Sequence, residues 1–133
     1  MATPQGVARD PRNRQSRGQT SHFAGHAAEE NIARDYEGRG YPIVHRRWRG
    51  KGGEIDLIAQ DGAGFVFVEV KQSRSFDRAA SHVSPRQMLR LQTAAEEFLG
   101  SQPLGALTDV RFDVALVDGR GDIRVIENAF GQF

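Results

Sequence analysis

The sequence predicts an α/β protein in which a mixed β-sheet is flanked by helices, with core elements in the order αβββαβ. Apolar residues recur at helical spacing in two segments, 22–37 and 85–99. Between them, three segments have the shorter period of β-strands: 41–49, 54–60 and 65–71. The length of 133 residues and the hydrophobic content of 38% leave room for one domain with one modest core.

The first 21 residues differ in composition from the rest of the chain. They are rich in Arg, Gln, Gly, Pro and Ser and contain almost no large apolar side chain. Such a segment buries too little surface to offset its ordering entropy. We therefore predict a disordered, arginine-rich tail over 1–21 and a single domain over 22–133. The tail is either a dispensable extension or a source of non-specific phosphate affinity.

The first helix is expected to begin next to Ser21, because serine caps helix N-termini well. Ile32 and Tyr36 lie four residues apart, so they share one stripe of this helix. Gly38 and Gly40 should end it.

The remaining elements follow from turn residues and apolar spacing. Asp61-Gly62-Ala63-Gly64 is a strong hairpin signal, which predicts that the second and third strands are antiparallel neighbours. A second helix should span Pro85–Leu99, with the proline in its first turn. Two further strands are expected over 110–117 and 123–126.

Composition excludes several classes of site. The chain has no cysteine, so a disulfide, a thiolate zinc site and a thiol nucleophile are all impossible. The longest apolar stretch near the middle is Phe65–Val68, far short of the ~20 residues that cross a membrane. The N-terminus has no apolar signal-peptide core. We therefore expect a protein of the reducing cytoplasm with no membrane partner.

Charge is unevenly distributed, although the formal net charge is only +1. The segment from Arg39 to Arg90 contains ten Lys or Arg but only five Asp or Glu. This excess indicates either a solvated basic face or a rim that contacts phosphates.

Four charged residues fall at the ends of two predicted strands. Side chains two apart in a strand share a face, which groups Glu54 with Asp56, and Glu69 with Lys71. The same rule places Ile55 and Leu57 together on the other face of their strand. A bare Glu-Val-Lys triplet is most simply an ion pair at a strand end. Asp56 lies one strand away, however, and two adjacent carboxylates repel each other unless a divalent cation joins them.

Two further features support a site. Glu29 precedes Ile32 by three residues and Tyr36 by seven, which puts its carboxylate on the inward stripe of the first helix. The second strand is preceded by Arg49-Gly50-Lys51-Gly52-Gly53, in which glycines allow close approach of phosphate and the cations attract it. That loop alone is a weak signal.

Together these residues match the chemistry of phosphodiester hydrolysis. Mg²⁺, or Mn²⁺ in its place, could be held by Asp56, Glu69 and a backbone carbonyl, and would polarise the phosphate and acidify bound water. Lys71 would orient or deprotonate that water, or neutralise charge in the transition state. Glu29 would be a ligand through water or the group that orients Lys71.

The motifs Gly53-Glu54-Ile55-Asp56-Leu57-Ile58 and Val66-Phe67-Val68-Glu69-Val70-Lys71 resemble the PD-(D/E)xK nuclease signature. More narrowly, the chain resembles the bacterial YraN family over roughly Gly25 to Phe130. That family is similar in fold to archaeal Holliday-junction resolvases, and most of its members are described only as endonuclease-like. The resemblance implies a restriction-endonuclease-like core.

The resemblance also implies roles for individual residues. Asp56 and Glu69 match the metal-binding carboxylates, Lys71 the catalytic lysine and Glu29 the helix glutamate. Arg86 stands where the family often has a lysine. The arginine retains the positive charge and hence the expected phosphate contact.

The chain departs from the family pattern at two places. Arg47 stands where an asparagine is usual, just before Trp48 and Arg49. After Lys71 the basic residue is shifted by one, to Arg74. These departures concern the positioning of substrate more than the binding of metal.

The resulting hypothesis is a Mg²⁺-dependent endonuclease that cleaves nucleic acid, with DNA as the expected substrate and branched DNA as one candidate form. Arg49, Lys51, Arg74 and Arg86 are the expected nucleic-acid contacts. Cleavage of a two-fold symmetric junction would require a homodimer. The alternative is a non-catalytic nucleic-acid-binding module with the same fold, and a protein-interaction scaffold ranks third.

Overall fold

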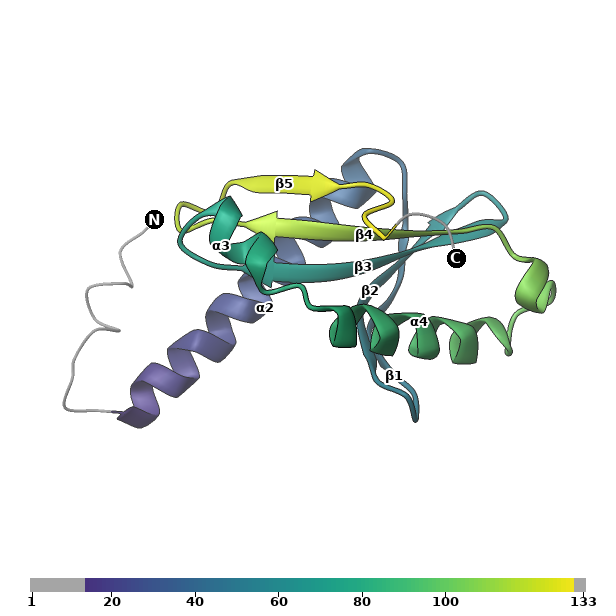
Figure 1. The fold of residues 1–133 in the computed structure, drawn as a ribbon. Helices are drawn as coiled ribbons and strands as arrows, with labels where there is room; N and C mark the ends of the chain where they lie inside the picture. The colour runs from purple at the N-terminus through teal and green to yellow at the C-terminus, as the bar shows by residue number, and fades with distance from the viewer. Residues whose placement is uncertain (1–13, 131–133) are drawn as a thin grey trace.

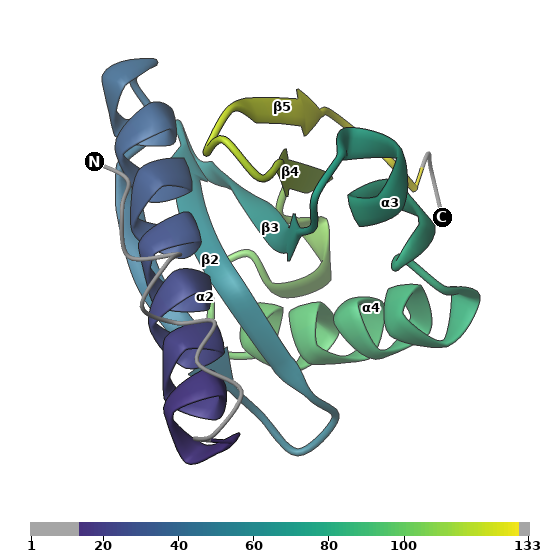
Figure 2. The ribbon, with the colours of Figure 1, turned by 90° about the vertical axis from the view of Figure 1, so that its left-hand side faces the viewer.

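The computed structural model describes the backbone of residues 14–130 and the side chains of residues 25–130. It contains a five-stranded mixed sheet in the order β1-β2-β3-β4-β5. The strands are β1 (Ile43–Arg49), β2 (Glu54–Asp61), β3 (Gly64–Gln72), β4 (Val110–Val117) and β5 (Ile123–Ile126). One face carries α2 (Arg14–Gly38), and the other carries α3 (Phe76–Ser81) and α4 (Pro85–Leu99) (Figures 1 and 2). A short 3₁₀ turn, η1 (Gly105–Leu107), precedes β4. The predicted α/β class, with an αβββαβ core and a mixed sheet, is confirmed.

The first helix is longer than the sequence predicted. It begins at Arg14, so Ser21 lies inside the helix and is not its cap, and residues 14–21 are helical instead of forming a tail. Arginine and glutamine are good helix formers, and no proline occurs between Pro11 and Pro42 to interrupt the helix. The rest of the predicted tail, residues 1–13, lies outside the described residues.

Strand pairing follows the predicted hairpin. Asp61 pairs with Gly64 at the turn between the antiparallel strands β2 and β3. Strands β3 and β4 are parallel, because the chain between them crosses over through α3 and α4. Helix α3 was not predicted. The Ser75 hydroxyl caps it by accepting a hydrogen bond from Arg78 N at 3.1 Å, but six residues are too few for a periodic signal.

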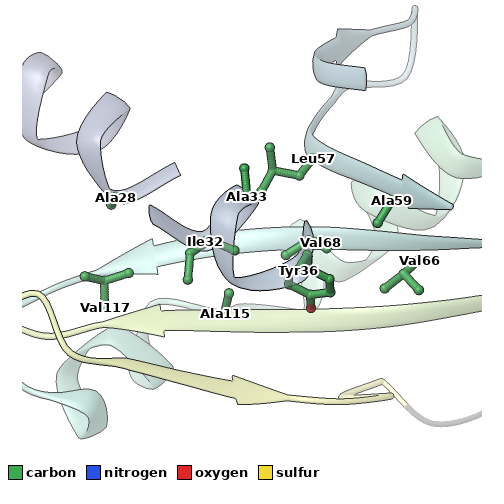
Figure 3. Close-up of a cluster of buried hydrophobic side chains, with 10 residues drawn as sticks. All are labelled: Ala28, Ile32, Ala33, Tyr36, Leu57, Ala59, Val66, Val68, Ala115 and Val117. Carbon is green, nitrogen blue, oxygen red and sulfur yellow. The ribbon is translucent and has the colours of Figure 1, made fainter. Parts of the chain in front are cut away.

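Two apolar layers hold the helices against the sheet. On the α2 side, Ile32, Ala33 and Tyr36 pack on alternate residues of the central strands, including Val66 and Val68 (Figure 3). On the α4 side, Phe65, Phe67, Phe98 and Phe112 form an aromatic cluster with Leu91 and Leu99. Phe98 meets Phe65 edge-on, with ring centroids 5.1 Å apart. Successive residues of β3 therefore face opposite sides of the sheet, with Val66 and Val68 toward α2 and Phe65 and Phe67 toward α4.

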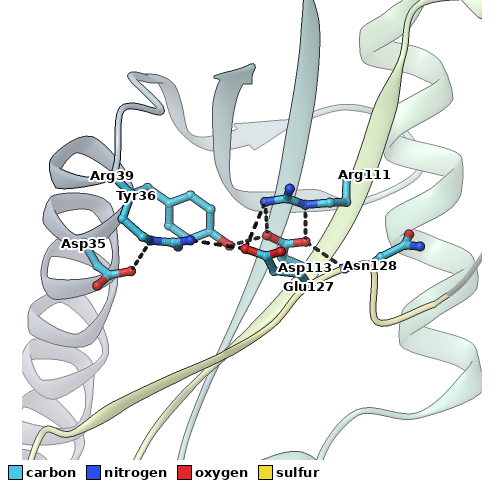
Figure 4. Close-up of polar contacts among 7 residues, drawn as sticks. All are labelled: Asp35, Tyr36, Arg39, Arg111, Asp113, Glu127 and Asn128. Carbon is cyan, nitrogen blue, oxygen red and sulfur yellow. Dashed lines mark hydrogen bonds and ion pairs between the residues drawn. The ribbon is translucent and has the colours of Figure 1, made fainter. Parts of the chain in front are cut away.

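A buried polar network ties α2 to β4 (Figure 4). The Tyr36 hydroxyl donates to Asp113 Oδ2 at 2.6 Å, and both side chains are fully buried. Arg111 donates two hydrogen bonds of 2.9 Å to the same carboxylate, and Asn128 N donates a fourth of 3.0 Å. Burial raises the pKa of Tyr36 most, and the hydrogen bond and negative charge of Asp113 raise it further. The phenol therefore stays protonated and serves as a donor. Asp113 therefore has a structural role, as the buried acceptor that joins Tyr36, Arg111 and Asn128.

No helix in the part of the chain that the structure describes is long and apolar enough to cross a membrane.

Candidate active site

The site lies where β2 and β3 separate. The last residues paired between these strands are Leu57 and Val68. Beyond them, β2 continues beside β1 and β3 continues beside β4, so the two strands form a fork (Figure 2). Asp56 is the first residue of β2 inside this fork. Its Oδ2 accepts a hydrogen bond from Val70 N at 2.8 Å, which satisfies a backbone donor that the diverging strand leaves open.

Alternation of side chains breaks at this point in both β1 and β2. Ile55 belongs to the apolar cluster under α4, whereas Leu57 belongs to the cluster under α2. The prediction that these two residues share a face is therefore wrong. Arg46 pairs with Leu57 and Trp48 with Ile55, so Arg47 and Asp56 occupy the same step between these pairs. Arg47 has a positive φ of 52° there, so β1 changes its direction at that step. Strand parity holds only in regular backbone, and a left-handed residue interrupts it.

Glu69 and Lys71 form a tight pair on β3. The distance from Lys71 Nζ to Glu69 Oε2 is 2.9 Å. Their side chains are only 15% and 17% exposed, for Lys71 and Glu69 respectively, so this pair does not fray into solvent at a strand end.

Glu29 reaches the site from α2. Its side chain is 18% exposed, and its Oε1 accepts a hydrogen bond from Arg47 Nε at 3.0 Å. The neighbouring pair of Glu30 with Arg46 is much more exposed, at 46% and 45%. Glu29 thus points inward, and its direct partner is Arg47, whereas the direct partner of Lys71 is Glu69.

Electrostatics link the four predicted residues. Burial and then the negative charge of Glu69 raise the pKa of Asp56 from 3.8 to about 7. The charge of Glu29 adds to this rise, while the hydrogen bond from Val70 and the charge of Lys71 oppose it. Glu69, Glu29 and Lys71 therefore all lie close enough to Asp56 to act on its carboxyl group, and the net effect of burial and these charges disfavours its ionised form.

The donor set fits a hard divalent cation. Asp56 and Glu69 offer carboxylate oxygens at the fork, and Mg²⁺ commonly uses one or two carboxylates and completes its shell with water and phosphate. Within residues 25–130, no three acidic or histidine side chains converge closely enough to hold a metal ion by themselves. A metal site here would thus be a two-carboxylate site that leaves positions open for water and substrate.

The four predicted nucleic-acid contacts come from separate segments. Arg49 is 77% exposed and pairs with Glu54 at 3.2 Å. Lys51, Arg74 and Arg86 are exposed, and within the described residues their side chains form no ion pair. They lie in the β1–β2 loop, after β3 and in the first turn of α4, respectively. The structure does not bring these four side chains into direct contact with one another.

Sequence reasoning missed how the β1–β2 loop is held. Glu97 of α4 accepts hydrogen bonds from Lys51 N at 2.9 Å and Gly52 N at 3.1 Å. These bonds lower the pKa of Glu97 and fix the loop against the helix. No local signal connects residues 45 positions apart, so only the fold reveals this contact.

Two cavities among the described residues lie away from the carboxylates. One of about 500 Å³ is lined by His45, Phe65, Phe98 and neighbours near the β2–β3 turn, and one of about 440 Å³ by residues of α4 and β4.

The order of strands and helices, with charged residues at a strand fork, defines a protein of the restriction-endonuclease-like α/β fold class. Residues 28–117 match the uncharacterised protein family UPF0102. The chain belongs to this family, which is the YraN family whose motifs were found in the sequence.

Relatives from several bacteria match most of the chain. A UPF0102 protein of Ruegeria pomeroyi is 62% identical over 117 residues, which cover 88% of this chain and 95% of the relative. One from Cereibacter sphaeroides is 59% identical over 113 residues, covering 85% of this chain and 97% of the relative. One from Dinoroseobacter shibae is 46% identical over 117 residues, covering 88% of this chain and 87% of the relative.

Proposed function

We propose that this protein is a metal-dependent endonuclease-like hydrolase that cleaves phosphodiester bonds in nucleic acid, with DNA as the expected substrate. The main support is the fork at which Asp56 and Glu69 meet beside Lys71. Burial and repulsion raise the pKa of Asp56 to about 7 there, so this cluster gains stability from a bound cation. The motifs of the nuclease signature fall on these residues, which adds to the proposal.

Asp56 and Glu69 would hold Mg²⁺, or Mn²⁺ in its place, and the bound ion would polarise the phosphate and acidify a water molecule. Lys71 lies beside them, with its Nζ 2.9 Å from Glu69 Oε2. Its ammonium group can donate one hydrogen bond to Glu69 and others to the attacking water and a phosphate oxygen. Lys71 would therefore orient the water and neutralise charge that builds on the phosphate during attack.

The exposed cations would position the substrate. Arg49, Lys51, Arg74 and Arg86 are spread over four segments, which suits contacts to successive phosphates of a backbone and not recognition of a base. Because Lys51 lies in a loop held by Glu97, its backbone position is defined before substrate arrives.

Cleavage assays with purified full-length protein test this function. Labelled branched, duplex and single-stranded DNA should be cut in Mg²⁺ or Mn²⁺ but not in EDTA. Asp56→Asn, Glu69→Gln and Lys71→Met should each lower the rate at least about a hundredfold. Asp61→Asn is the matched control, because it removes an exposed carboxylate at the other end of the same strand and should cut at the normal rate. No cleavage by the wild type with any metal would count against an enzyme.

A non-catalytic nucleic-acid-binding module is the second candidate. It is favoured by the lack of a three-residue metal cluster among the described side chains and by the exposed Lys51, Arg74 and Arg86. Salt-dependent DNA binding that survives Asp56→Asn, without cleavage, would select this candidate. Sedimentation with a DNA junction would test the expected homodimer, which needs two sites on one symmetric substrate.

A further inference from the structure

Arg47 is a cation placed beside the carboxylates, with a side chain that is 37% exposed. Its Nε donates to Glu29 Oε1 at 3.0 Å, and it occupies the same step of the β1–β2 register as Asp56. The bond to Glu29 raises the pKa of Arg47, and the charges of Glu54 and Asp56 act on it in the same direction. In the protein without metal, Arg47 therefore supplies positive charge to the carboxylates that a divalent ion would also need.

The backbone is bent to place this side chain. Neighbouring residues of a regular strand point to opposite faces, yet Arg46 and Arg47 both reach α2, where they pair with Glu30 and Glu29. The positive φ of 52° at Arg47 makes this possible. A left-handed conformation in a residue other than glycine costs roughly 1 kcal/mol or more, so it persists only where the surroundings enforce it.

A purely structural role, in which Arg47 only links β1 to α2, does not explain its ion pair with Glu29 and its positive φ. The exposed Arg46–Glu30 pair at 2.8 Å already makes that tie from the adjacent residue, in the same direction. Of these two pairs, Arg47–Glu29 is the one that is partly buried, and the charge of Asp56 acts on its arginine.

We propose that Arg47 has two positions: it is the counter-cation of Glu29 when no metal is bound, and it becomes a ligand of the substrate phosphate when a divalent ion occupies the site. This inference rests on the proposed metal site. Two cations beside the same carboxylates repel each other, so metal binding weakens the ion pair between Arg47 and Glu29. The released guanidinium has five donors in a planar fork that matches phosphate oxygens. Metal and substrate binding would then be coupled, each favouring the other.

Mn²⁺ titration of the metal-free protein, followed by calorimetry, gives the first test. Arg47→Gln should bind Mn²⁺ about three- to tenfold more tightly than the wild type, because a competing charge is gone. Arg47→Gly removes the same charge and suits a positive φ, so it should show the same gain even if the glutamine variant folds poorly. Arg46→Gln is the matched control, since it breaks the neighbouring ion pair with the same helix, and its Mn²⁺ affinity should stay within about twofold of wild type.

DNA binding in EDTA gives the second test. Glu29→Gln releases Arg47 without metal, so the affinity for a labelled DNA hairpin at low salt should rise about threefold or more. In the Arg47→Gln background the same change should produce a clearly smaller gain.

The outcomes separate this inference from the proposed function. Equal Mn²⁺ affinity in wild type, Arg47→Gln and Arg47→Gly, with binding lost in Asp56→Asn, would overturn the two-position role while leaving the metal site intact. Equal gains from Glu29→Gln in both backgrounds would overturn it too. If neither wild type nor Arg47→Gln binds Mn²⁺, the metal site and the inference both fail.

Discussion

Replacing Asp56 with asparagine should stabilise the metal-free protein at neutral and alkaline pH. The folded state raises the pKa of this carboxyl from 3.8 to about 7. Between these values the folded protein keeps a proton that the unfolded chain has lost, so stability falls as pH rises through this window. One pKa unit corresponds to about 1.4 kcal/mol, and a rise from 3.8 to about 7 therefore corresponds to about 4 kcal/mol. Asparagine avoids this charge and can still accept the hydrogen bond from Val70 N.

Urea unfolding in EDTA at several pH values between 4 and 8.5 measures the effect. The free energy of unfolding of Asp56→Asn should match the wild type at pH 4 or below and exceed it by up to about 4 kcal/mol at pH 8. Glu54→Gln removes an exposed carboxylate two residues away on the same strand and should change stability by at most about 1 kcal/mol. A difference between Asp56→Asn and wild type that is flat with pH, or a less stable variant at pH 8, would refute the reasoning. Mn²⁺ should stabilise the wild type at pH 8 but not the variant, because only the charged carboxylate binds the ion.

Three other predictions concern the frame around the site. Tyr36→Phe should lower the free energy of unfolding by about 1–3 kcal/mol, measured by urea titration, because the buried Asp113 loses its phenolic donor. Gly64→Ala should destabilise the fold by roughly 1–3 kcal/mol in the same assay, since a Cβ there would lie 2.3 Å from Asp109 O; an unchanged midpoint would contradict the close packing. Glu97→Gln should speed hydrogen exchange at the amides of the β1–β2 loop, and equal exchange rates would show that the loop does not depend on this carboxylate.

Local signals predicted the fold well where each element has its own start and stop. Helix α4 spans Pro85–Leu99 as predicted, because proline begins it and a periodic apolar stripe continues to Gly100. The β2–β3 turn was predicted equally well, since Gly62 in Asp61-Gly62-Ala63-Gly64 adopts the positive φ of 59° that a tight hairpin turn requires. The predicted start of α2, next to Ser21, was wrong. Residues 14–21 lack the apolar periodicity that signals a helix, although they contain no residue that prevents one.

The candidate site was only partly predictable, because its key step is a departure from regular strand geometry. Parity correctly grouped Glu69 with Lys71, which lie in the regular strand β3. It failed for Ile55 and Leu57, since β1 and β2 change direction together at Arg47 and Asp56. The motif alone marked Arg47 merely as a departure from a family pattern, whereas the fold shows where its charge lies.

The two ends of strand β3 have opposite effects on stability. The buried end stabilises the fold, and this stability allows the strained site at the other end to persist. At the paired end, Phe65 to Val68 are buried on both faces, between α2 and the aromatic cluster under α4. Each such side chain stabilises the fold by roughly 1.5–3 kcal/mol through burial. At the forked end, the raised pKa of Asp56 and the left-handed Arg47 together oppose folding by a comparable few kcal/mol. Because the Tyr36–Asp113 anchor fixes α2 two turns beyond Glu29, the helix cannot move away to relieve the repulsion. The carboxylates are therefore held together before any cation binds, which is the arrangement that favours capture of a divalent ion.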